Sequence, residues 1–174
     1  MSAPSPVSTA FLDRDGTINV KAPAGDYVKS WREFRFLPGA KEAIRRLNEA
    51  GIRVVIVTNQ RGIALGRMTD EDLADIHDRM AEALGRAGAR VDAIYYCPHD
   101  RDACDCRKPG VGMFLAAQAD DPAISFAEAA VIGDSLADVE AGTRLGCRTI
   151  LMGTDRRGLT LPESTWSFLP VGRR

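Results

Sequence analysis

The chain has 174 residues, with 23 basic and 24 acidic side chains and a formal net charge of −1 at pH 7. This length suits one domain, which we expect to cover residues 1–174. The charges are mixed, so the chain lacks the basic stripe that nucleic-acid-binding proteins need. No stretch approaches the ~20 apolar residues of a membrane span, and residues 1–8 do not resemble a signal peptide. We expect a cytoplasmic monomer that binds neither nucleic acid nor membrane.

Strand and helix patterns alternate along the chain. Apolar, β-branched runs predict strands leading into Asp13 and over residues 53–58, 91–95, 129–132 and 148–152. Helical spacing of apolar residues predicts helices over 40–50, from the cap Thr69 to Gly85 or Gly88, over 112–119 and over 136–145. This order predicts an α/β fold with a doubly wound parallel sheet that binds ligands at the carboxyl ends of its strands.

The first predicted strand runs into two carboxylates, Asp13 and Asp15, which Gly16 and Thr17 follow at once. Residues two apart in a strand point to the same side, and a glycine lets the chain turn with its backbone N–H groups facing inward. One carboxylate can act as a nucleophile and the other can transfer a proton, while Mg²⁺ can hold their charges together. An ordinary polar strand end with an Asp-Gly turn is the alternative.

More polar groups follow other predicted strands. Thr58 and Asn59 close the second strand, where a hydroxyl suits a phosphate. Lys108 gives a cation close to the start of the next helix, and Asp134 and Asp138 offer carboxylates for a metal ion. Taken singly, Thr58 is explained as a capping residue, Lys108 as a solvated surface base and Asp134 as part of a turn. Their shared position beyond strand ends predicts one phosphate- and metal-binding site.

A cluster of metal-ligand residue types lies in the loop before Lys108. Three thiols and one imidazole occur within ten residues, at Cys97, His99, Cys104 and Cys106. This is a Cys₃His set of the kind that binds structural zinc, and in a cytosolic chain a metal is favoured over a disulfide. The set leaves no vacant ligand position. We therefore expect Zn²⁺ to shape the loop that presents Arg107 and Lys108 without taking part in the reaction.

Taken in order, Asp13-x-Asp15-Gly16-Thr17, Thr58, Lys108 and Gly133-Asp134-x-x-x-Asp138 resemble the four motifs of the haloacid dehalogenase (HAD) superfamily of phosphohydrolases, over residues 10–152. The resemblance implies that Asp13 attacks phosphorus to form an aspartyl-phosphate. It implies that Asp15 protonates the leaving alcohol and then activates water.

The same resemblance implies the remaining roles in the site. Thr58 and Lys108 would hold the transferring phosphoryl group, with Asn59 and Arg107 as further substrate-binding residues. Mg²⁺ would be bound by Asp13, by Asp15 through its backbone carbonyl and by Asp134, with Asp138 further from the ion. These roles agree with the physics of phosphoryl transfer, in which positioning and charge neutralisation supply most of the catalysis.

Within the superfamily, the zinc loop and the runs 13–19, 58–64 and 106–109 resemble two groups of phosphatases. These are the D-glycero-D-manno-heptose 1,7-bisphosphate 7-phosphatases and the histidinol-phosphate phosphatase domains. The run 58–64, followed by Gly66 and Arg67, is more similar to the heptose group, whereas the four residues between His99 and Cys104 are nearer the histidinol form. The resemblance implies removal of the 7-phosphate from a heptose bisphosphate, with histidinol-phosphate hydrolysis as the alternative.

A non-catalytic phosphate-sensing module is the alternative from another class, and the presence of both Asp13 and Asp15 argues against it. Neither interval between motifs can house a cap domain, so we expect a capless, open site. Loops at 19–27, 60–67 and 97–108 would recognise the substrate. Positive charge there, from Arg61, Arg67 and Arg107, suits a small metabolite with a second phosphate, such as a sugar bisphosphate.

Overall fold

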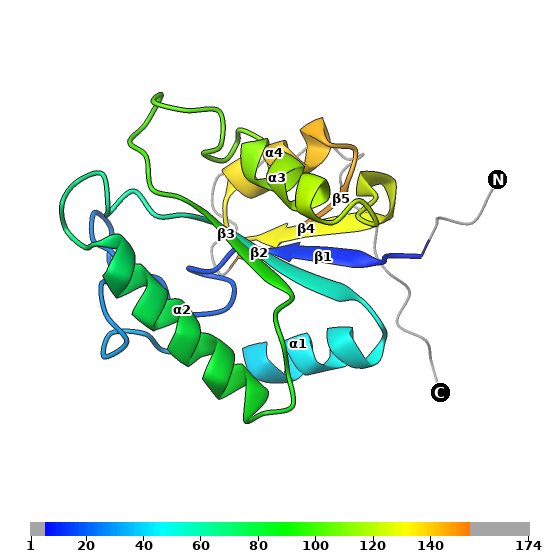
Figure 1. The fold of residues 1–174 in the computed structure, drawn as a ribbon, viewed down its shortest axis with the longest axis horizontal. Coiled ribbons are helices and arrows are strands. Elements are labelled where there is room, and N and C mark those ends of the chain that lie inside the picture. Colours follow the sequence, from blue (N-terminus) through cyan, green and yellow to red (C-terminus); the bar gives the residue numbers. More distant parts are fainter. Residues whose placement is uncertain (1–5, 154–174) are drawn as a thin grey trace.

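The computed structural model describes residues 6–153, in which a parallel five-stranded sheet has the order β3-β2-β1-β4-β5. Its strands are β1 (Thr9–Leu12), β2 (Arg53–Asn59), β3 (Ala93–Cys97), β4 (Ala129–Gly133) and β5 (Arg148–Leu151). Helices α1 (Ala40–Glu49) and α2 (Asp70–Gly85) cover one face, and α3 (Gly112–Asp120) and α4 (Leu136–Arg144) cover the other (Figure 1). A 3₁₀ turn, η1 (Phe126–Glu128), leads into β4. The doubly wound parallel sheet is confirmed.

The ends of the predicted domain, residues 1–5 and 154–174, lie outside the described residues. Within residues 6–153, none of the helices has the length and apolar character needed to cross a membrane.

Two hydrophobic cores explain why the strands are apolar on both sides. Leu12 and Ile56 pack into the core under α1 and α2, whereas Phe11 and Val55 pack into the core under α3. Successive side chains of a strand point to opposite faces, so a strand covered on both faces must be apolar at nearly every position. Each such side chain contributes roughly 1.5–3 kcal/mol of hydrophobic stabilisation.

Helix α2 begins at the predicted cap. The Thr69 hydroxyl accepts a hydrogen bond from the Asp72 backbone N–H at 3.1 Å, and the Asp72 carboxylate accepts one from the Thr69 N–H at 2.9 Å. This capping box satisfies two N–H groups that the helix itself leaves unpaired. The predicted inner stripe is buried, and His77 lies on the same buried face: Leu73, Ile76, His77, Met80 and Leu84.

The third strand differs from its prediction over 91–95, because it begins at Ala93 and ends at Cys97. Asp92 accounts for the later start. Its backbone N–H donates to the Val54 carbonyl, and its carboxylate accepts from the Val54 N–H at 2.7 Å. The Asp92 side chain thus takes the place of the backbone carbonyl that would accept from Val54 if β3 began earlier. Cys97, the first cysteine of the predicted zinc site, therefore belongs to the sheet.

Strand order reverses at β1, since the chain moves to one side for β2 and β3 and to the other for β4 and β5. The loops that follow β1 and β4 diverge there, which is where doubly wound sheets bind ligands. The segment between β1 and α1 forms no cap domain. Its Ile18, Val28 and Phe34 are buried in the core under α1 and α2.

Candidate active site

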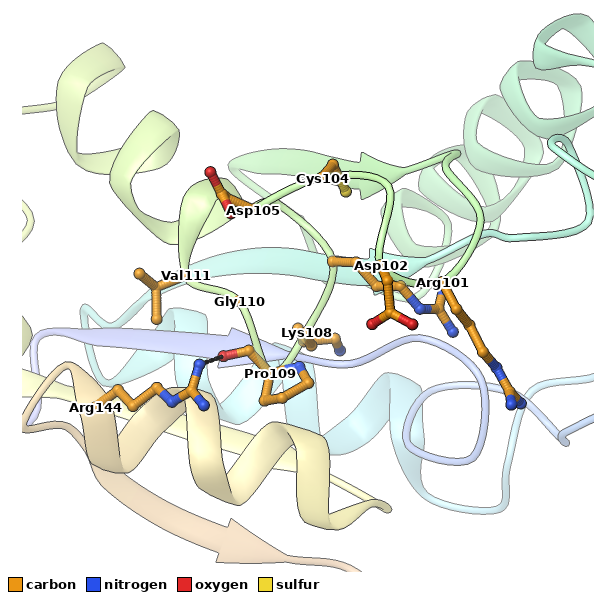
Figure 2. A pocket seen from close by; sticks show the side chains of 10 residues that line it. Arg101, Asp102, Cys104, Asp105, Lys108, Pro109, Gly110, Val111 and Arg144 are labelled. Carbon is orange, nitrogen blue, oxygen red and sulfur yellow. Dashed lines mark hydrogen bonds between the residues drawn. The ribbon is translucent and has the colours of Figure 1, made fainter.

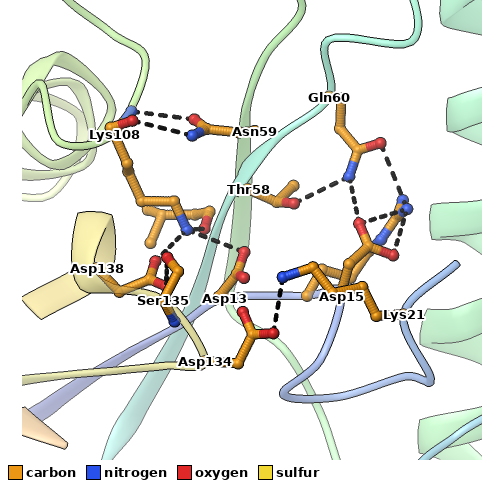
Figure 3. Close-up of polar contacts among 12 residues, drawn as sticks. Asp13, Asp15, Lys21, Thr58, Asn59, Gln60, Lys108, Asp134, Ser135 and Asp138 are labelled. Atoms are coloured by element: carbon orange, nitrogen blue, oxygen red, sulfur yellow. Dashed lines mark hydrogen bonds and ion pairs between the residues drawn. The ribbon is translucent and has the colours of Figure 1, made fainter. Parts of the chain in front are cut away.

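A buried ammonium lies at the carboxyl end of the sheet. Lys108 Nζ is 2.9 Å from the Asp13 carboxylate, 2.6 Å from the Asp138 carboxylate and 2.7 Å from the Val57 carbonyl (Figure 3). Burial would lower the pKa of Lys108, but the two carboxylates raise it above its usual value. Lys108 therefore stays charged, and its charge joins residues from β2, α4 and the loop after β1.

Two side chains at the end of β2 face this group. Asn59 holds the backbone of Lys108 from both sides, accepting from its N–H at 3.0 Å and donating to its carbonyl at 3.1 Å. The Thr58 hydroxyl is buried and accepts from the Gln60 amide at 2.9 Å. Asn59 thus positions the main chain of Lys108, a contact that the residue pattern did not indicate.

The Asp15 carboxylate is held by three donors. Arg14 Nη2 lies 3.1 and 3.0 Å from its two oxygens, while the amides of Asn19 and Gln60 each donate at 2.8 Å. Burial would raise the pKa of Asp15, but the Arg14 guanidinium and the two amides bring it below its usual value.

Asp13 and Asp15 lie at the same cavity because of a turn in the chain and not, as was expected, because of strand alternation. Strand β1 ends at Leu12, so strand alternation does not align the two carboxylates. The chain turns tightly after Asp13 instead, and the Arg14 carbonyl accepts the N–H groups of the residues at positions 17, 18 and 19. This turn carries Asp15 round to the same cavity.

The carboxylates of Asp13, Asp134 and Asp138 converge, with one oxygen from each lying within 4.8 Å of the others. Burial raises the pKa of Asp13 to about 6; the Lys108 ammonium opposes this shift and the Asp138 carboxylate adds to it. The Oδ1 atom of Asp134 is buried and has no hydrogen-bond partner among the described residues. A cluster of hard oxygens with an unused acceptor suits a divalent cation.

Lys21 is a site residue that the sequence pattern did not single out. Its ammonium lies 2.7 Å from Oδ2 of Asp134 (Figure 3). Lys21 is 57% exposed, and only the expected recognition loop at 19–27 pointed to this region. Gln60 was expected only as the start of the recognition loop at 60–67, and Arg14 was given no role, because no signal in the pattern separates it from ordinary polar neighbours.

The residues predicted to be catalytic, to bind phosphate or to bind magnesium line one cavity of about 270 Å³. Its walls include Asp13, Asp15, Thr58, Asn59, Arg107, Lys108 and Asp134. A second cavity of about 560 Å³ is lined by residues of the loop that follows β3, among them Arg101 and Asp102, and by Arg144 of α4 (Figure 2). Arg107 and Lys108 line both cavities.

The three arginines expected near the substrate do not lie together. Arg61 pairs with Asp100 at 2.5 Å, and Arg67 donates to the Gly25 carbonyl at 3.1 Å. Arg107 is the one that lines the cavity, and its Nη1 atom is buried without a partner among residues 6–153. The structure thus leaves one of the three guanidinium groups beside the carboxylates.

The predicted zinc ligands converge. Cys104 Sγ lies 3.5 Å from Cys97 Sγ and 3.1 Å from Cys106 Sγ, and His99 Nδ1 lies 3.3 Å from Cys106 Sγ. All four donor atoms fall within 4.8 Å of one another. Three sulfurs and one nitrogen at these separations can surround a single ion, as a tetrahedral structural zinc site requires.

Two parts of the chain match models of known protein families. Residues 10–76 match the family model described as haloacid dehalogenase-like hydrolase, and residues 105–165 match one described as HAD-hydrolase-like. The two matches together include the turn after β1, the end of β2, Lys108 and the α4 carboxylate.

Curated relatives and a solved structure resemble most of the chain. It is 42% identical to the D-glycero-beta-D-manno-heptose-1,7-bisphosphate 7-phosphatase of Bordetella bronchiseptica, covering 94% of this chain and 89% of that one. It is 36% identical to the D-glycero-alpha-D-manno-heptose-1,7-bisphosphate 7-phosphatase of Mycobacterium tuberculosis, covering 91% and 87%. A crystal structure of the Bordetella bronchiseptica D,D-heptose 1,7-bisphosphate phosphatase with magnesium and phosphate superposes with a TM-score of 0.83 at 40% identity, covering 91% and 90%.

The turn after β1 supports a prediction about Gly16. Its φ is +94°, and a Cβ at this position would overlap the Asp134 carboxylate, whereas Gly25 has a φ of +84° and open space around it. Both Gly→Ala changes add backbone strain of about 1–3 kcal/mol. Gly16→Ala must also displace Asp134, so we expect it to lower the free energy of unfolding more than Gly25→Ala does in urea denaturation. Equal losses would show that Asp134 moves aside without cost.

Proposed function

The chain belongs to the haloacid dehalogenase-like hydrolases, in the family of D-glycero-D-manno-heptose-1,7-bisphosphate 7-phosphatases, and from this we propose that it removes the 7-phosphate of a heptose 1,7-bisphosphate. The observation that carries the proposal is the placement of Asp13 and Asp15 on one cavity wall with the Lys108 ammonium against Asp13. This arrangement suits a phosphoric monoester hydrolase and argues against a non-catalytic module, which needs no such pair.

In the first step an oxygen of Asp13 attacks phosphorus, an aspartyl-phosphate forms and the bond from phosphorus to the sugar oxygen breaks. Lys108 Nζ contacts Oδ1 of Asp13 at 2.9 Å, which places a positive charge beside the attacking carboxylate. Lys108 and the Thr58 hydroxyl neutralise and orient the phosphoryl oxygens. Asn59 keeps Lys108 in place through its backbone.

Asp15 transfers protons in both steps. It gives a proton to the departing sugar oxygen, and it then takes one from the water that attacks the aspartyl-phosphate and releases inorganic phosphate. The three donors around its carboxylate stabilise the ionised form, which suits the second step directly. The first step requires Asp15 to be protonated when the substrate is bound.

The donor set fits a resident divalent cation. Asp13, the backbone carbonyl of Asp15 and Asp134 would hold Mg²⁺, which supplies positive charge to the phosphoryl oxygens when bound. The unpartnered Oδ1 of Asp134 supports this assignment. Asp138 is already bonded to Lys108 and to the Ser135 hydroxyl, so we assign it to positioning Lys108.

The Cys₃His cluster would hold zinc in a structural role. Cys106 precedes the cavity residue Arg107 by one position, so order in the cluster fixes the start of the segment that carries Arg107 and Lys108. Four protein ligands fill a tetrahedral site and leave no position for substrate.

Arg107 is the residue we assign to the remote phosphate, since it lines both cavities and has a buried nitrogen without a partner. The heptose relatives at 36–42% identity favour the heptose bisphosphate over histidinol phosphate. They include enzymes named for the alpha and for the beta anomer, so both anomers belong in a substrate screen.

Replacing Asp13 by Asn should abolish phosphate release, because the amide has the same shape and is a poor nucleophile. Asp75→Asn, at an exposed position of α2, is the control for loss of a carboxylate. Phosphate release would be measured on heptose 1,7-bisphosphate, with circular dichroism to verify folding. Turnover above a few per cent of wild type would contradict the role of Asp13 as nucleophile.

Replacing Cys106 by Ser should lower the zinc content and the Tm together, because the binding energy of a structural zinc site is folding energy. Cys147→Ser is the matched control, since Cys147 is the fourth cysteine and lies outside the cluster. Zinc would be measured by elemental analysis of protein purified without chelator. Wild-type protein without zinc would refute the assignment.

Arg107→Ala should cost ~1.5–3 kcal/mol in kcat/KM on the bisphosphate, the range for a charge-assisted hydrogen bond, and much less on heptose 7-phosphate. Arg61→Ala is the control, because Arg61 is paired with Asp100. Equal losses on both substrates would assign Arg107 to the transferring phosphate. A wild-type preference for histidinol phosphate would overturn the heptose proposal.

A further inference from the structure

Arg14 carries a charge in the interior of the protein, behind the cavity wall. Its side chain is 0% exposed, although it is the residue between Asp13 and Asp15. Nη2 contacts both oxygens of Asp15 and lies 3.4 Å from Oε1 of Gln60, and Nη1 lies 3.2 Å from Nε2 of His77 on α2. The guanidinium therefore connects a cavity carboxylate to a buried helix face.

The contact with His77 has a defined direction. A guanidinium has no acceptor, so Nη1 donates and Nε2 of His77 accepts, which requires the neutral imidazole with its proton on Nδ1. Burial and the Arg14 charge lower the pKa of His77 to about 4, in agreement with a neutral ring. His77 lies among the core residues of α2, so its acceptor is fixed by the packing of a 16-residue helix.

We propose that Arg14 and His77 are positioning residues for Asp15: His77 fixes the plane of the guanidinium, and the guanidinium sets the orientation of the Asp15 carboxylate toward the cavity. This inference rests on the proposed function, in which Asp15 transfers protons. A lysine could neutralise Asp15, but its ammonium lacks the planar set of donors that contacts Asp15, Gln60 and His77.

The contacts around Asp15 support orientation over simple neutralisation. Asn19 donates to Oδ1, Gln60 donates to Oδ2, and Arg14 reaches both oxygens from the side of the core. These donors fix the carboxylate against rotation. Burying a guanidinium is costly, and Arg14 Nε has no hydrogen-bond partner in the described part of the chain, so the cost is only partly offset by its own contacts.

The first test varies the acceptor at residue 77. His77→Phe keeps a ring and removes the acceptor, whereas His77→Gln keeps an acceptor at a similar reach. Leu84→Ala, two turns further along the buried face of α2, destabilises the helix without a contact to Arg14 and is the control for stability. Each variant would be assayed for kcat and KM on an alkyl phosphate, whose leaving group needs protonation, and on 4-nitrophenyl phosphate, whose leaving group does not.

A proton donor in the wrong orientation lowers kcat most for the substrate whose leaving group needs protonation. We expect His77→Phe to lower kcat on the alkyl phosphate ~10–100-fold and on 4-nitrophenyl phosphate only ~2–3-fold. His77→Gln should recover most of the loss, and Leu84→Ala should affect both substrates alike. Equal losses on both substrates with His77→Phe, or no loss on either, would overturn the proposal.

A second test needs no turnover. The guanidinium N–H signals of Arg14, identified by their absence in Arg14→Lys, should show restricted rotation and slow exchange with water in ¹⁵N-arginine-labelled wild type and in His77→Gln. In His77→Phe they should exchange rapidly. Unchanged signals in His77→Phe would overturn the proposal whatever the activity, whereas a wild-type protein that hydrolyses no phosphate ester would overturn the proposed function alone.

Discussion

The site depends on one buried ammonium shared by two carboxylates and a carbonyl. Lys108 Nζ contacts Asp13, Asp138 and the Val57 carbonyl, which come from three separate parts of the chain. In a medium of low dielectric constant each carboxylate would be costly without the cation, and the cation would be costly without them. The ends of β1 and β2 and the first turn of α4 are therefore held at fixed separations by electrostatics as well as by the sheet. Asn59 extends the same constraint to the backbone of Lys108.

The sheet was predictable because both of its faces are buried, and a strand with two buried faces leaves an unmistakable apolar run. The motif residues were predictable as a set because parallel strands end at the same edge. What could not be read from the pattern is how side chains pair across that edge. The Asp92 side chain takes a backbone partner from Val54 and so delays the start of β3. The commitment of Arg61 to Asp100 likewise depends on the path of two loops, which no local pattern fixes.

The Cys₃His cluster lies directly before the segment that carries Arg107 and Lys108. Cys97 belongs to β3, and the other three members of the Cys₃His cluster follow in the loop. The cluster is therefore tied to the sheet at one end and to the cavity at the other. The cavity is lined by Arg107 and Lys108, which directly follow the last cysteine of the cluster. The cavity residues lie at strand ends and in the loops beyond them, and such loops can change with little effect on the sheet.

The pairing of Arg14 has a consequence for how this protein can evolve. Among the described residues, Asp15 is the carboxylate that balances the buried Arg14 charge, whereas Lys108 keeps Asp138 when Asp13 is lost. Removing one partner of a buried ion pair costs ~3–5 kcal/mol, a large share of the stability of a typical domain. A descendant that abandons catalysis can therefore discard Asp13 at little cost to its fold, but it can discard Asp15 only together with Arg14. Pseudoenzymes derived from this scaffold should more often retain the second aspartate than the first.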